Sequence, residues 1–496
     1  MTERWTAGHV PGLPAEAIRY ETLSFGNDRA PSSAEQQILS IDVPLLDATQ
    51  MSTVAAHVRA SARSTLRSMP VSSIIARIDR AVMRLLDPSD THRRDLDRLL
   101  PIVTGYDSEM IRLGLNGYLQ AFRAAELHRF VVEDFANPKL LDEFQPVVKG
   151  GRVRAVGPDL LVHGWAGNVP GLPLWSFTSG LLVKGGNIGK LPSAEPVFAT
   201  VFARALIEID GTLADCFAIL WWQGENARVA QSLFDAADIV VAYGGDRAIA
   251  DIRELVPATT RFLAYGNKIG VALVGREALD AQRGMATARR AARDVVRYDQ
   301  QGCYSPQVIY VERGASIDPR AFAQYVAAEL ANLAHRFPRR ALALEDAVAI
   351  SEWRHAQEIA MLDDPSSALI GDADAAWTVA YSDRLRALSP TATQRTVMIV
   401  AVDALEHAVD VIAPMARVLQ TVGVAIAPSR LRVLGDLLAD AGITRIAALG
   451  QMTLPEAGWH HDGRCNLADL VRYVEVERSA ERYADTLADY AEEQSA

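Results

Sequence analysis

The feature that most constrains the fold is an alternation of short apolar runs with amphipathic stretches through the middle of the chain. Between about residues 160 and 274, apolar runs are separated by segments whose apolar residues recur at helical spacing. Such alternation is typical of a largely parallel sheet covered by helices. The expected strands are 160–162, 181–183, 217–221, 238–242, 262–265 and 270–274, and the expected helices are 195–209 and 226–236.

The alternation returns in the second half of the chain, so we predict an α/β fold throughout. Here the expected strands are 308–311, 376–380 and 396–402, and the expected helices are 318–334, 341–362, 403–420 and 431–441. Ahead of the alternating region, residues 51–136 show helical spacing and 38–46 a strand pattern, while 1–30 predict a loosely ordered lead-in. A Gly-Gly turn at 150–151 between two extended runs predicts a β-hairpin.

Length, charge and cysteine usage narrow the class of protein. A chain of 496 residues is too long for one simple core, so we expect two or three domains. A net charge of −11 argues against a nucleic-acid surface, which is basic and clustered. The three cysteines are far apart and form no CxxC pair, which favours a reducing compartment over a disulfide framework. Residues 1–30 lack the regions of a signal peptide, and the apolar stretch 172–183 is too short to cross a bilayer. We therefore expect a cytoplasmic protein without a membrane span.

Cys303 is the residue best suited to covalent chemistry. It follows Gly302 on a polar turn between a helix-like stretch that ends near Tyr298 and the apolar run 308–311. A turn between rigid elements can position a thiol, and the thiolate is the form that attacks a carbonyl carbon. A buried structural cysteine is the commoner case, so the position alone leaves both interpretations open.

Three glycine-containing turns follow expected strands, where open α/β sheets bind their ligands. They are 164–171, 185–190 and 243–246, and none contains a GxGxxG or GxxxxGK[ST] phosphate-binding motif. A nucleotide crevice and plain turn chemistry therefore remain equally open. Lysine is rare in this arginine-rich chain, yet Lys184, Lys190 and Lys268 all fall in glycine-containing stretches.

Several motifs resemble a known superfamily in their order along the chain. Ala-Gly-Asn-Val-Pro at 166–170, Gly-Asn-Ile-Gly-Lys-Leu-Pro-Ser-Ala-Glu-Pro at 186–196, the Gly-Gly pair at 244–245 and Gln-Gly-Cys at 301–303 follow the aldehyde dehydrogenase superfamily. More narrowly, Asp-Gln-Gln-Gly-Cys-Tyr-Ser-Pro-Gln from residue 299 and Trp-His-His-Asp-Gly from residue 459 resemble the LuxC family of fatty acyl reductases. Those enzymes reduce acyl thioesters to aldehydes with NADPH.

The resemblance covers about residues 140–475 and implies an aldehyde-dehydrogenase-like arrangement of domains. A Rossmann-type cofactor-binding domain would span 31–265 and carry a β-hairpin arm near 145–163. An α/β catalytic domain would span 266–440, followed by a C-terminal segment at 441–496. In the superfamily the arm pairs with another subunit, and an unpaired hairpin edge is an aggregation liability, so a homo-oligomer is expected.

The resemblance also implies catalytic roles. Cys303 would take an acyl group from coenzyme A or from a carrier enzyme such as an acyl-protein synthetase, and hydride from the nicotinamide would reduce the resulting thioester. Asn168 matches the superfamily asparagine that, with the cysteine backbone N–H, stabilises the oxyanion. The alternative for Asn168 is a plain turn residue after Gly167.

The implied cofactor contacts favour NADPH. Lys190 matches the lysine that binds the adenosine ribose, with Lys184 as an alternative. Ser193 stands where NAD-selective members carry a glutamate, and a serine accommodates a 2′-phosphate that a carboxylate would repel. Glu195, two residues later, leaves this choice open.

The Gly244-Gly245 pair completes the implied cofactor contacts, because its backbone could approach the pyrophosphate. Asp246 after it is more simply a helix N-cap.

Two departures from the superfamily pattern bear on the reaction. Ala264 stands where members that hydrolyse the acyl-enzyme carry a glutamate base, so the thioester should survive to accept hydride or exchange with a thiol. The Glu-Ile-Phe-Gly-Pro segment expected before 396–402 is absent, so the nicotinamide-ribose contact stays unassigned. An acyltransferase, or an acylating dehydrogenase working oxidatively, is the second interpretation, and a non-catalytic relative that binds acyl chains is the third.

The histidine-containing motif near the C-terminus has no assigned role. His460, His461, Asp462 and Cys465 match no common zinc spacing, so we expect a polar cluster near the active site or an interface, and no metal.

Overall fold

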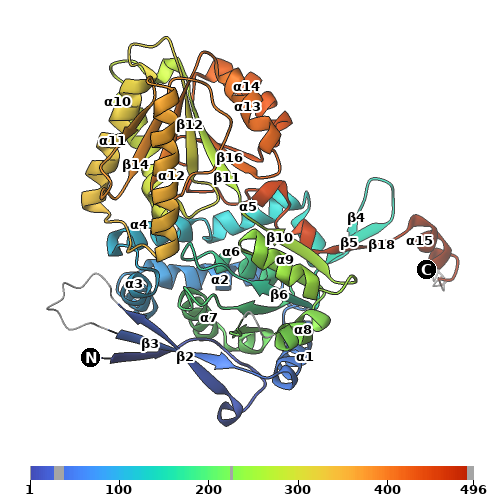
Figure 1. The fold of residues 1–496 in the computed structure, drawn as a ribbon. Coiled ribbons are helices and arrows are strands. Elements are labelled where there is room, and N and C mark those ends of the chain that lie inside the picture. Colours follow the sequence, from blue (N-terminus) through green and yellow to red (C-terminus); the bar gives the residue numbers. More distant parts are fainter. Residues whose placement is uncertain (1, 27–37, 224–226, 489–496) are drawn as a thin grey trace.

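A computed structural model describes residues 2–26, 38–223 and 227–488. Figure 1 shows two α/β lobes, one above the other, and an arm that projects sideways. The lower lobe contains a five-stranded sheet and the upper lobe a seven-stranded sheet. Both sheets were expected from the alternation of apolar runs. None of the helices in these described ranges is long and apolar enough to cross a membrane.

The sheet of the lower lobe is fully parallel and runs in the order β10-β9-β6-β7-β8. Its strands are β6 (Leu160–Gly164), β7 (Gly186–Lys190), β8 (Phe217–Leu220), β9 (Ile239–Tyr243) and β10 (Arg261–Tyr265). Four of them match predicted runs. The predicted strand at 181–183 is wrong, because those residues close helix α6 (Pro173–Leu182) and the strand begins at Gly186.

Two glycines explain why β7 was missed. Gly186 and Gly189 lower its apparent strand propensity. Gly189 is nonetheless required, because a Cβ there would lie 1.9 Å from the ring of Trp165.

Helices cover both faces of this sheet. Helices α1 (Ala48–Thr65) and α8 (Ala227–Ala236) pack on one face, where Val54 and Val58 join Val162, Ile188 and Val240 in a buried cluster. Helices α6 and α7 (Phe198–Ile209) lie on the other face. Beyond them the predicted helical layer is present as α2 (Val71–Leu86), α3 (Thr91–Thr104), α4 (Ser108–Gln120) and α5 (Ala124–Asp134).

The N-terminal region contains more regular structure than the expected lead-in. Strands β1 (Thr2–Thr6) and β2 (Arg19–Gly26) pair with β3 (Ile38–Leu45) in the order β1-β3-β2. A β-bridge joins His9 to Ile219, so this region lies against β8, the edge strand of the lower sheet. Tertiary pairing of this kind is not visible in local composition.

The upper sheet runs in the order β13-β14-β15-β12-β11-β16-β17 and is parallel except for β13. Helices α10 and α11 cover one face, and α13 and α14 the other, as Figure 1 shows. The strands are β11 (Ile269–Val274), β12 (Pro306–Glu312), β13 (Ala368–Ile370), β14 (Thr378–Ser382), β15 (Thr396–Val402), β16 (Leu419–Ala425) and β17 (Arg445–Ala448). The helices are α10 (Gly284–Val296), α11 (Pro319–Arg336), α12 (Leu344–Asp363), α13 (Leu405–Ile412) and α14 (Pro428–Asp440).

One helix of this lobe is shorter than predicted. The helix expected over 403–420 ends at Ile412, and β16 begins at Leu419.

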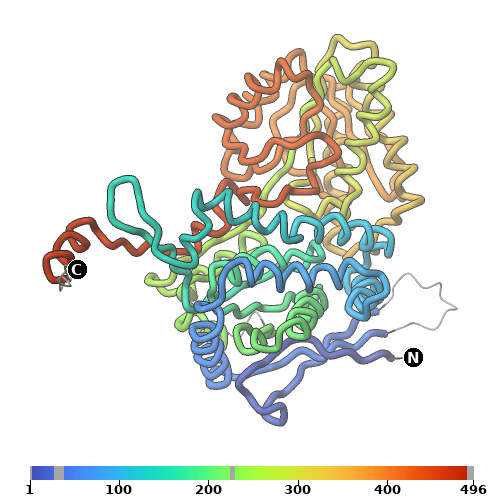
Figure 2. The backbone as a smooth tube through the Cα atoms, turned by 180° about the vertical axis from the view of Figure 1, so that it is seen from behind, coloured from blue at the N-terminus to red at the C-terminus, as the bar shows by residue number. Residues whose placement is uncertain are grey.

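The arm contains the predicted hairpin and one strand from the far end of the chain. Strands β4 (Gln145–Pro146) and β5 (Arg152–Val156) form the hairpin, and β18 (Arg472–Val476) pairs antiparallel with the other edge of β5. Helix α15 (Arg478–Asp485) continues from β18, and both views show the arm standing clear of the lobes (Figures 1 and 2).

Candidate active site

A cavity of about 720 Å³ lies where the carboxyl ends of β6, β9 and β10 face the turn before β12. This volume is in the range of small-molecule sites. The cavity brings together four of the residues predicted to be catalytic or cofactor-binding: Cys303, Asn168, Gly244 and Gly245. They come from three separate segments, and the two sheets place them at one edge, as the rule for open α/β sheets predicts.

The turn that carries Cys303 has an unusual backbone. Helix α10 ends at Val296, and then Tyr298, Asp299 and Gln300 adopt φ values of 47°, 50° and 63°. Left-handed backbone is uncommon for residues other than glycine, so a run of three requires support from its surroundings.

The support comes from buried polar contacts. The carboxylate of Asp299 accepts hydrogen bonds from Nε of Arg395 at 2.7 Å and from the backbone N–H of Arg340 at 3.2 Å. Both side chains of the Asp299–Arg395 pair are 1% exposed. The amide of Gln300 donates to the carbonyls of Pro306 and Thr396. The turn is thereby fixed to β12 and to the start of β15.

A second left-handed segment faces the first. Thr393, Gln394 and Arg395 have φ values of 53°, 51° and 69°. The amide of Gln301 donates to Oγ1 of Thr393 at 3.1 Å, and Thr393 also lines the cavity. This segment precedes β15, where the superfamily's usual cofactor motif is absent from the sequence.

Asn168 lies against the cysteine turn. Its Nδ2 donates to the carbonyl of Gln301 at 2.7 Å. The hydroxyl of Tyr106, on the helical layer, reaches the carbonyl of Asn168 at 2.8 Å and that of Tyr298 at 3.2 Å. One Nδ2 hydrogen therefore holds the turn, and the amide keeps a second hydrogen at the cavity that Asn168 lines.

The sulfur of Cys303 has a side-chain hydrogen-bond donor. Nε2 of Gln420, on β16, lies 3.3 Å from Cys303 Sγ and 2.6 Å from Oδ1 of Asp462. Burial raises the pKa of the Cys303 thiol to about 11, and the Gln420 hydrogen bond opposes that rise. Sequence reasoning missed Gln420 because the predicted helix over 403–420 hid its strand.

The expected cofactor residues divide into two groups. Gly244 and Gly245 line the cavity, and Gly245 is the N-cap of helix α9 (Asp246–Leu255). A helix N-terminus with accessible backbone suits an anionic pyrophosphate. Asp246 is the first residue of this helix rather than its cap. Lys190 is the last residue of β7, which pairs with β6, the strand that precedes Asn168. Lys190 does not line the cavity.

The Lys190 ammonium lies 5.5 Å from the centre of the Trp222 ring, and burial lowers its pKa. Ser193 is exposed, and its hydroxyl accepts a hydrogen bond from Nε1 of Trp221. Glu195 points into the protein, where its carboxylate accepts from the backbone N–H groups of Val197 and Phe198 at 2.8 Å. The Glu195 side chain therefore does not face the solvent side, from which a ligand would approach.

The alternative role suggested for Lys184 does not fit the structure. Lys184 precedes β7, at the amino end of that strand, whereas ligands of open α/β sheets lie beyond the carboxyl ends. Its ammonium pairs with the carboxylate of Asp142 at 2.6 Å, and its residue is 6% exposed. We therefore assign Lys184 to the packing of the helical layer.

Aromatic side chains form one wall of the cavity. Tyr265 and His461 stack with their ring centres 4.5 Å apart, and Trp459 lies 4.7 Å from His461. Burial lowers the pKa of His461 to about 4, so its ring is uncharged at neutral pH. Tyr118 and Trp175, from helices that gave no chemical signal in the sequence, complete this wall. Of the polar residues in the Trp-His-His-Asp-Gly motif, His461 lines this cavity.

The charged groups of the cavity are few. Among the described residues that line it, Asp246 is the single carboxylate. The ammonium group of Lys268 donates a hydrogen bond to the carbonyl of Arg417. Ala264, which the resemblance aligns with the base of the hydrolytic members, lies in β10, and none of the residues of β10 is a carboxylate. A thioester on Cys303 would thus meet no carboxylate base from that strand.

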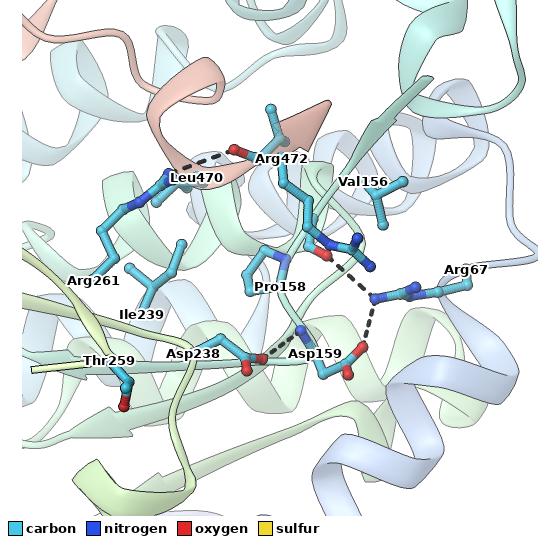
Figure 3. Close-up of a pocket in the computed structure, with 12 residues that line it drawn as sticks. Arg67, Val156, Pro158, Asp159, Asp238, Ile239, Thr259, Arg261, Leu470 and Arg472 are labelled. Atoms are coloured by element: carbon cyan, nitrogen blue, oxygen red, sulfur yellow. Dashed lines mark hydrogen bonds and ion pairs between the residues drawn. The ribbon is translucent and has the colours of Figure 1, made fainter. Parts of the chain in front are cut away.

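A second cavity, of about 340 Å³, lies at the opposite, amino-terminal edge of the lower sheet (Figure 3). Arg67 pairs there with Asp159, and the Asp238 carboxylate accepts from the Asp159 backbone N–H. Arg261 donates to the carbonyl of Asp469, which ties the C-terminal segment to the sheet. The contact of Arg67 with Asp159 ties the helical layer to this edge of the sheet, and the contact of Arg261 does the same for the C-terminal segment.

His460 belongs to a different cluster from His461. Asp134, His460 and Cys465 each place one potential ligand atom within 4.8 Å of the others. The Asp134 carboxylate already accepts from the backbone N–H groups of Leu467 and Ala468. Three groups are fewer than the four ligands of a structural zinc site, and we interpret the cluster as an anchor for the C-terminal segment.

Comparison with known proteins places this geometry in context. The sequence profile described as acyl-CoA reductase (LuxC) matches residues 66–473. A long-chain acyl-protein thioester reductase 2 from Photobacterium leiognathi is 28% identical over 396 residues, which cover 78% of each chain. A long-chain acyl-protein thioester reductase from Photorhabdus luminescens is 25% identical over 487 residues, covering 97% of this chain and 94% of that one.

Solved structures establish the fold. Aldehyde dehydrogenase 21 from Physcomitrella patens, in complex with succinate, superposes with a TM-score of 0.71 at 13% identity, covering 96% of this chain and 98% of that one. Lactaldehyde dehydrogenase from Escherichia coli gives a TM-score of 0.66 at 12% identity, covering 96% and 99%. The predicted aldehyde-dehydrogenase-like α/β fold is confirmed.

Proposed function

Because the chain belongs to the acyl-CoA reductase (LuxC) family, it is an aldehyde-forming oxidoreductase, and we propose that it reduces a long-chain fatty acyl thioester with NADPH through Cys303. The observation that carries the assignment of Cys303 is its position. The thiol lies on a fixed turn at the cavity, beside Asn168 and without a carboxylate base from β10.

In the proposed reaction, Cys303 is the nucleophile and Asn168 helps to stabilise the oxyanion. The Cys303 thiolate attacks the acyl carbonyl, a carbon–sulfur bond forms to Sγ, and the bond to the donor sulfur breaks. A nicotinamide cofactor held at the Gly244-Gly245 turn would supply the hydride that reduces the resulting thioester. The Asn168 amide and the Cys303 backbone N–H donate to the oxygen as negative charge develops on it, and one such donor is typically worth about 3 kcal/mol. The aldehyde leaves when the bond to Sγ breaks, which restores the thiolate.

Preference for NADPH over NADH is supported by two side chains. Ser193 is exposed at the carboxyl end of the lower sheet and offers a hydroxyl to a 2′-phosphate. Glu195, the one carboxylate that left the choice open in the sequence, is 1% exposed and bonded to backbone N–H groups. In this proposal Lys190 binds the adenosine ribose and the Gly244-Gly245 turn receives the pyrophosphate.

The acyl donor is proposed to be coenzyme A or an acyl-carrying partner enzyme, as the names of the acyl-protein thioester reductases suggest for those relatives. We further propose a cytoplasmic homo-oligomer in which the arm contacts a second subunit. A reducing compartment suits an enzyme whose nucleophile is a free thiol.

The experiment follows NADPH absorbance with a long-chain acyl-CoA, comparing wild type with Cys303→Ala. Acyl-dependent oxidation with release of aldehyde, abolished in the variant and slower with NADH, is the expected result. A cysteine-dependent acyl adduct without oxidation would instead indicate acyl transfer. If Cys303→Ala retained the wild-type rate, the assignment of the nucleophile would be wrong.

A further inference from the structure

Three distant segments meet at the Cys303 sulfur. Gln420 comes from β16 and Asp462 from the short 3-10 turn His461–Gly463. The Gln420 amide nitrogen lies 3.3 Å from Sγ of Cys303 and 2.6 Å from Oδ1 of Asp462. The two contacts use the two hydrogens of one amide group, so the carboxylate and the sulfur share a single donor.

The chemistry of the contacts fixes the orientation of this amide. A carboxylate oxygen only accepts hydrogen bonds, so the NH2 end of Gln420 faces Asp462 and therefore also the sulfur. The oxygen end accepts from the hydroxyl of Thr421 at 3.2 Å. Gln420 is fully buried, which removes competition from water. The donor thus points at Sγ before any substrate binds.

The surroundings of Cys303 shift the pKa of its thiol in opposite directions. Burial is the largest influence and raises the thiol pKa, and the negative charge of Asp462 raises it further. The Gln420 hydrogen bond and the positive charge of Arg445, on β17, lower it. The neighbouring Tyr304 and the uncharged His461 add no charge at neutral pH. Lys268 lines the same cavity, with its ammonium bonded to a carbonyl.

We propose that Gln420 and Asp462 are positioning residues for the nucleophile: Asp462 orients the Gln420 amide, and the amide stabilises the Cys303 thiolate. This rests on the proposed function, in which the thiolate takes part in two steps of each turnover. It is the attacking group when the acyl chain transfers from the donor sulfur to Sγ. It is the leaving group when the bond from Sγ to the reduced carbon breaks. A donor already aimed at the sulfur supports both steps.

The test uses two variants with opposite expected effects. Gln420→Leu removes the donor at nearly constant volume and should raise the pKa of Cys303 by about one unit or more, since hydrogen bonds to charged groups are the stronger class. Asp462→Asn keeps an oxygen that can accept from Gln420 and suits the left-handed φ of 53° at this position. Because it removes the nearby negative charge, it should lower the thiol pKa.

The measurement is the pH dependence of Cys303 alkylation by iodoacetamide, followed by peptide mass spectrometry so that Cys216 and Cys465 are resolved. Gln307→Leu is the matched control, since Gln307 lines the same cavity and its amide oxygen accepts from the backbone N–H of Thr391. The control should leave the Cys303 alkylation profile unchanged.

Alkylation requires neither acyl donor nor cofactor, so this test stands apart from the reductase assay. Opposite shifts in Gln420→Leu and Asp462→Asn, with matching thermal unfolding curves, support the proposal. An unchanged profile in Gln420→Leu, or shifts of both variants in the same direction, would overturn it even if the reductase activity is found. Opposite shifts in a protein without reductase activity would support the positioning role and refute the proposed reaction.

Discussion

At the scale of single residues, Asn168 illustrates how one amide serves structure and chemistry together. One hydrogen of its Nδ2 holds the carbonyl of Gln301, next to the nucleophile turn. Tyr106 fixes the backbone carbonyl of the same asparagine from the helical layer. The side chain is therefore placed before substrate arrives, which is the condition for an effective oxyanion donor.

Replacing Asn168 by alanine should slow aldehyde formation by about 100- to 1000-fold, since one oxyanion donor is removed. The rate is measured as kcat for NADPH oxidation with a long-chain acyl-CoA. Alkylation of Cys303 in the same protein provides the control, because a thiol that still reacts normally shows that the turn is intact. A variant with wild-type kcat would assign Asn168 a turn role only.

Glu195 gives a prediction about pH. Burial raises its pKa from 4.5 to about 7. Between these two pH values, the carboxyl group is mostly neutral in the folded state and mostly ionised in the unfolded chain. Its contribution to stability is fully present below pH 4.5 and is lost as pH rises through about 7. Glutamine at this position cannot ionise. Between pH 4.5 and 7, the unfolding free energy of wild type should therefore fall by about 3 kcal/mol relative to that of Glu195→Gln.

Urea unfolding of both proteins at several pH values measures this difference. At pH 4 the side chain is neutral in both states, so the pH-dependent part of the difference should be absent there. A constant difference across the range would contradict the buried, protonated carboxyl group.

At the scale of elements, strands with clear apolar, β-branched runs such as β9 were predicted from the sequence, whereas β7 and β16 were missed for different reasons. Strand β9 is such a run and matched its prediction, whereas β7 contains two glycines and is recognisable only by its place between β6 and β8. Strand β16 was not predicted: the helix expected over 403–420 extended into its first two residues, Leu419 and Gln420, and no strand was assigned to the rest.

The candidate site divides in the same way. Cys303 and Asn168 were predicted from their motifs and both line the cavity. Trp175 in the cavity wall and Gln420 beside the Cys303 sulfur have no local signature and are placed there only by the fold. Distances between segments far apart in sequence are set by tertiary packing, which periodicity does not report.

The two left-handed segments lead to a prediction about stability. Arg395→Leu leaves the Asp299 carboxylate buried without its charged partner, and breaking a buried pair in this way typically costs about 3–5 kcal/mol. The double variant Asp299→Asn with Arg395→Leu should recover part of that loss, because the unpaired charge is gone. Urea unfolding of the single and double variants measures both values. Equal losses in both would show that the charge pair is not what holds the turns together.

At the scale of the whole molecule, the arm is the part least explained by the single chain. It stands clear of both lobes (Figure 2). Its three-stranded sheet runs in the order β18-β5-β4, so β18 and β4 are its edge strands. Val148, in the loop between β4 and β5, is fully exposed. Val148 therefore offers a position at which the proposed contact of the arm with a second subunit can be tested.

Val148→Glu should therefore weaken the proposed homo-oligomer, since a carboxylate would have to be buried at the contact. Size-exclusion chromatography with light scattering reports the mass of wild type and variant across a range of concentrations. Leu362→Glu, at an equally apolar exposed position on α12 away from the arm, is the control. A wild type that is monomeric at all concentrations would refute the proposed oligomer.

The contact between the N-terminal region and β8 has a practical consequence for making shortened versions of this enzyme. The family profile begins at residue 66, which invites cloning from that point. Such a fragment would lack β1, β2, β3 and the His9–Ile219 bridge, and would leave the β8 edge bare. Bare sheet edges recruit other chains, so fragments starting there should be recovered as aggregates, whereas fragments that retain residue 2 onward should stay dispersed.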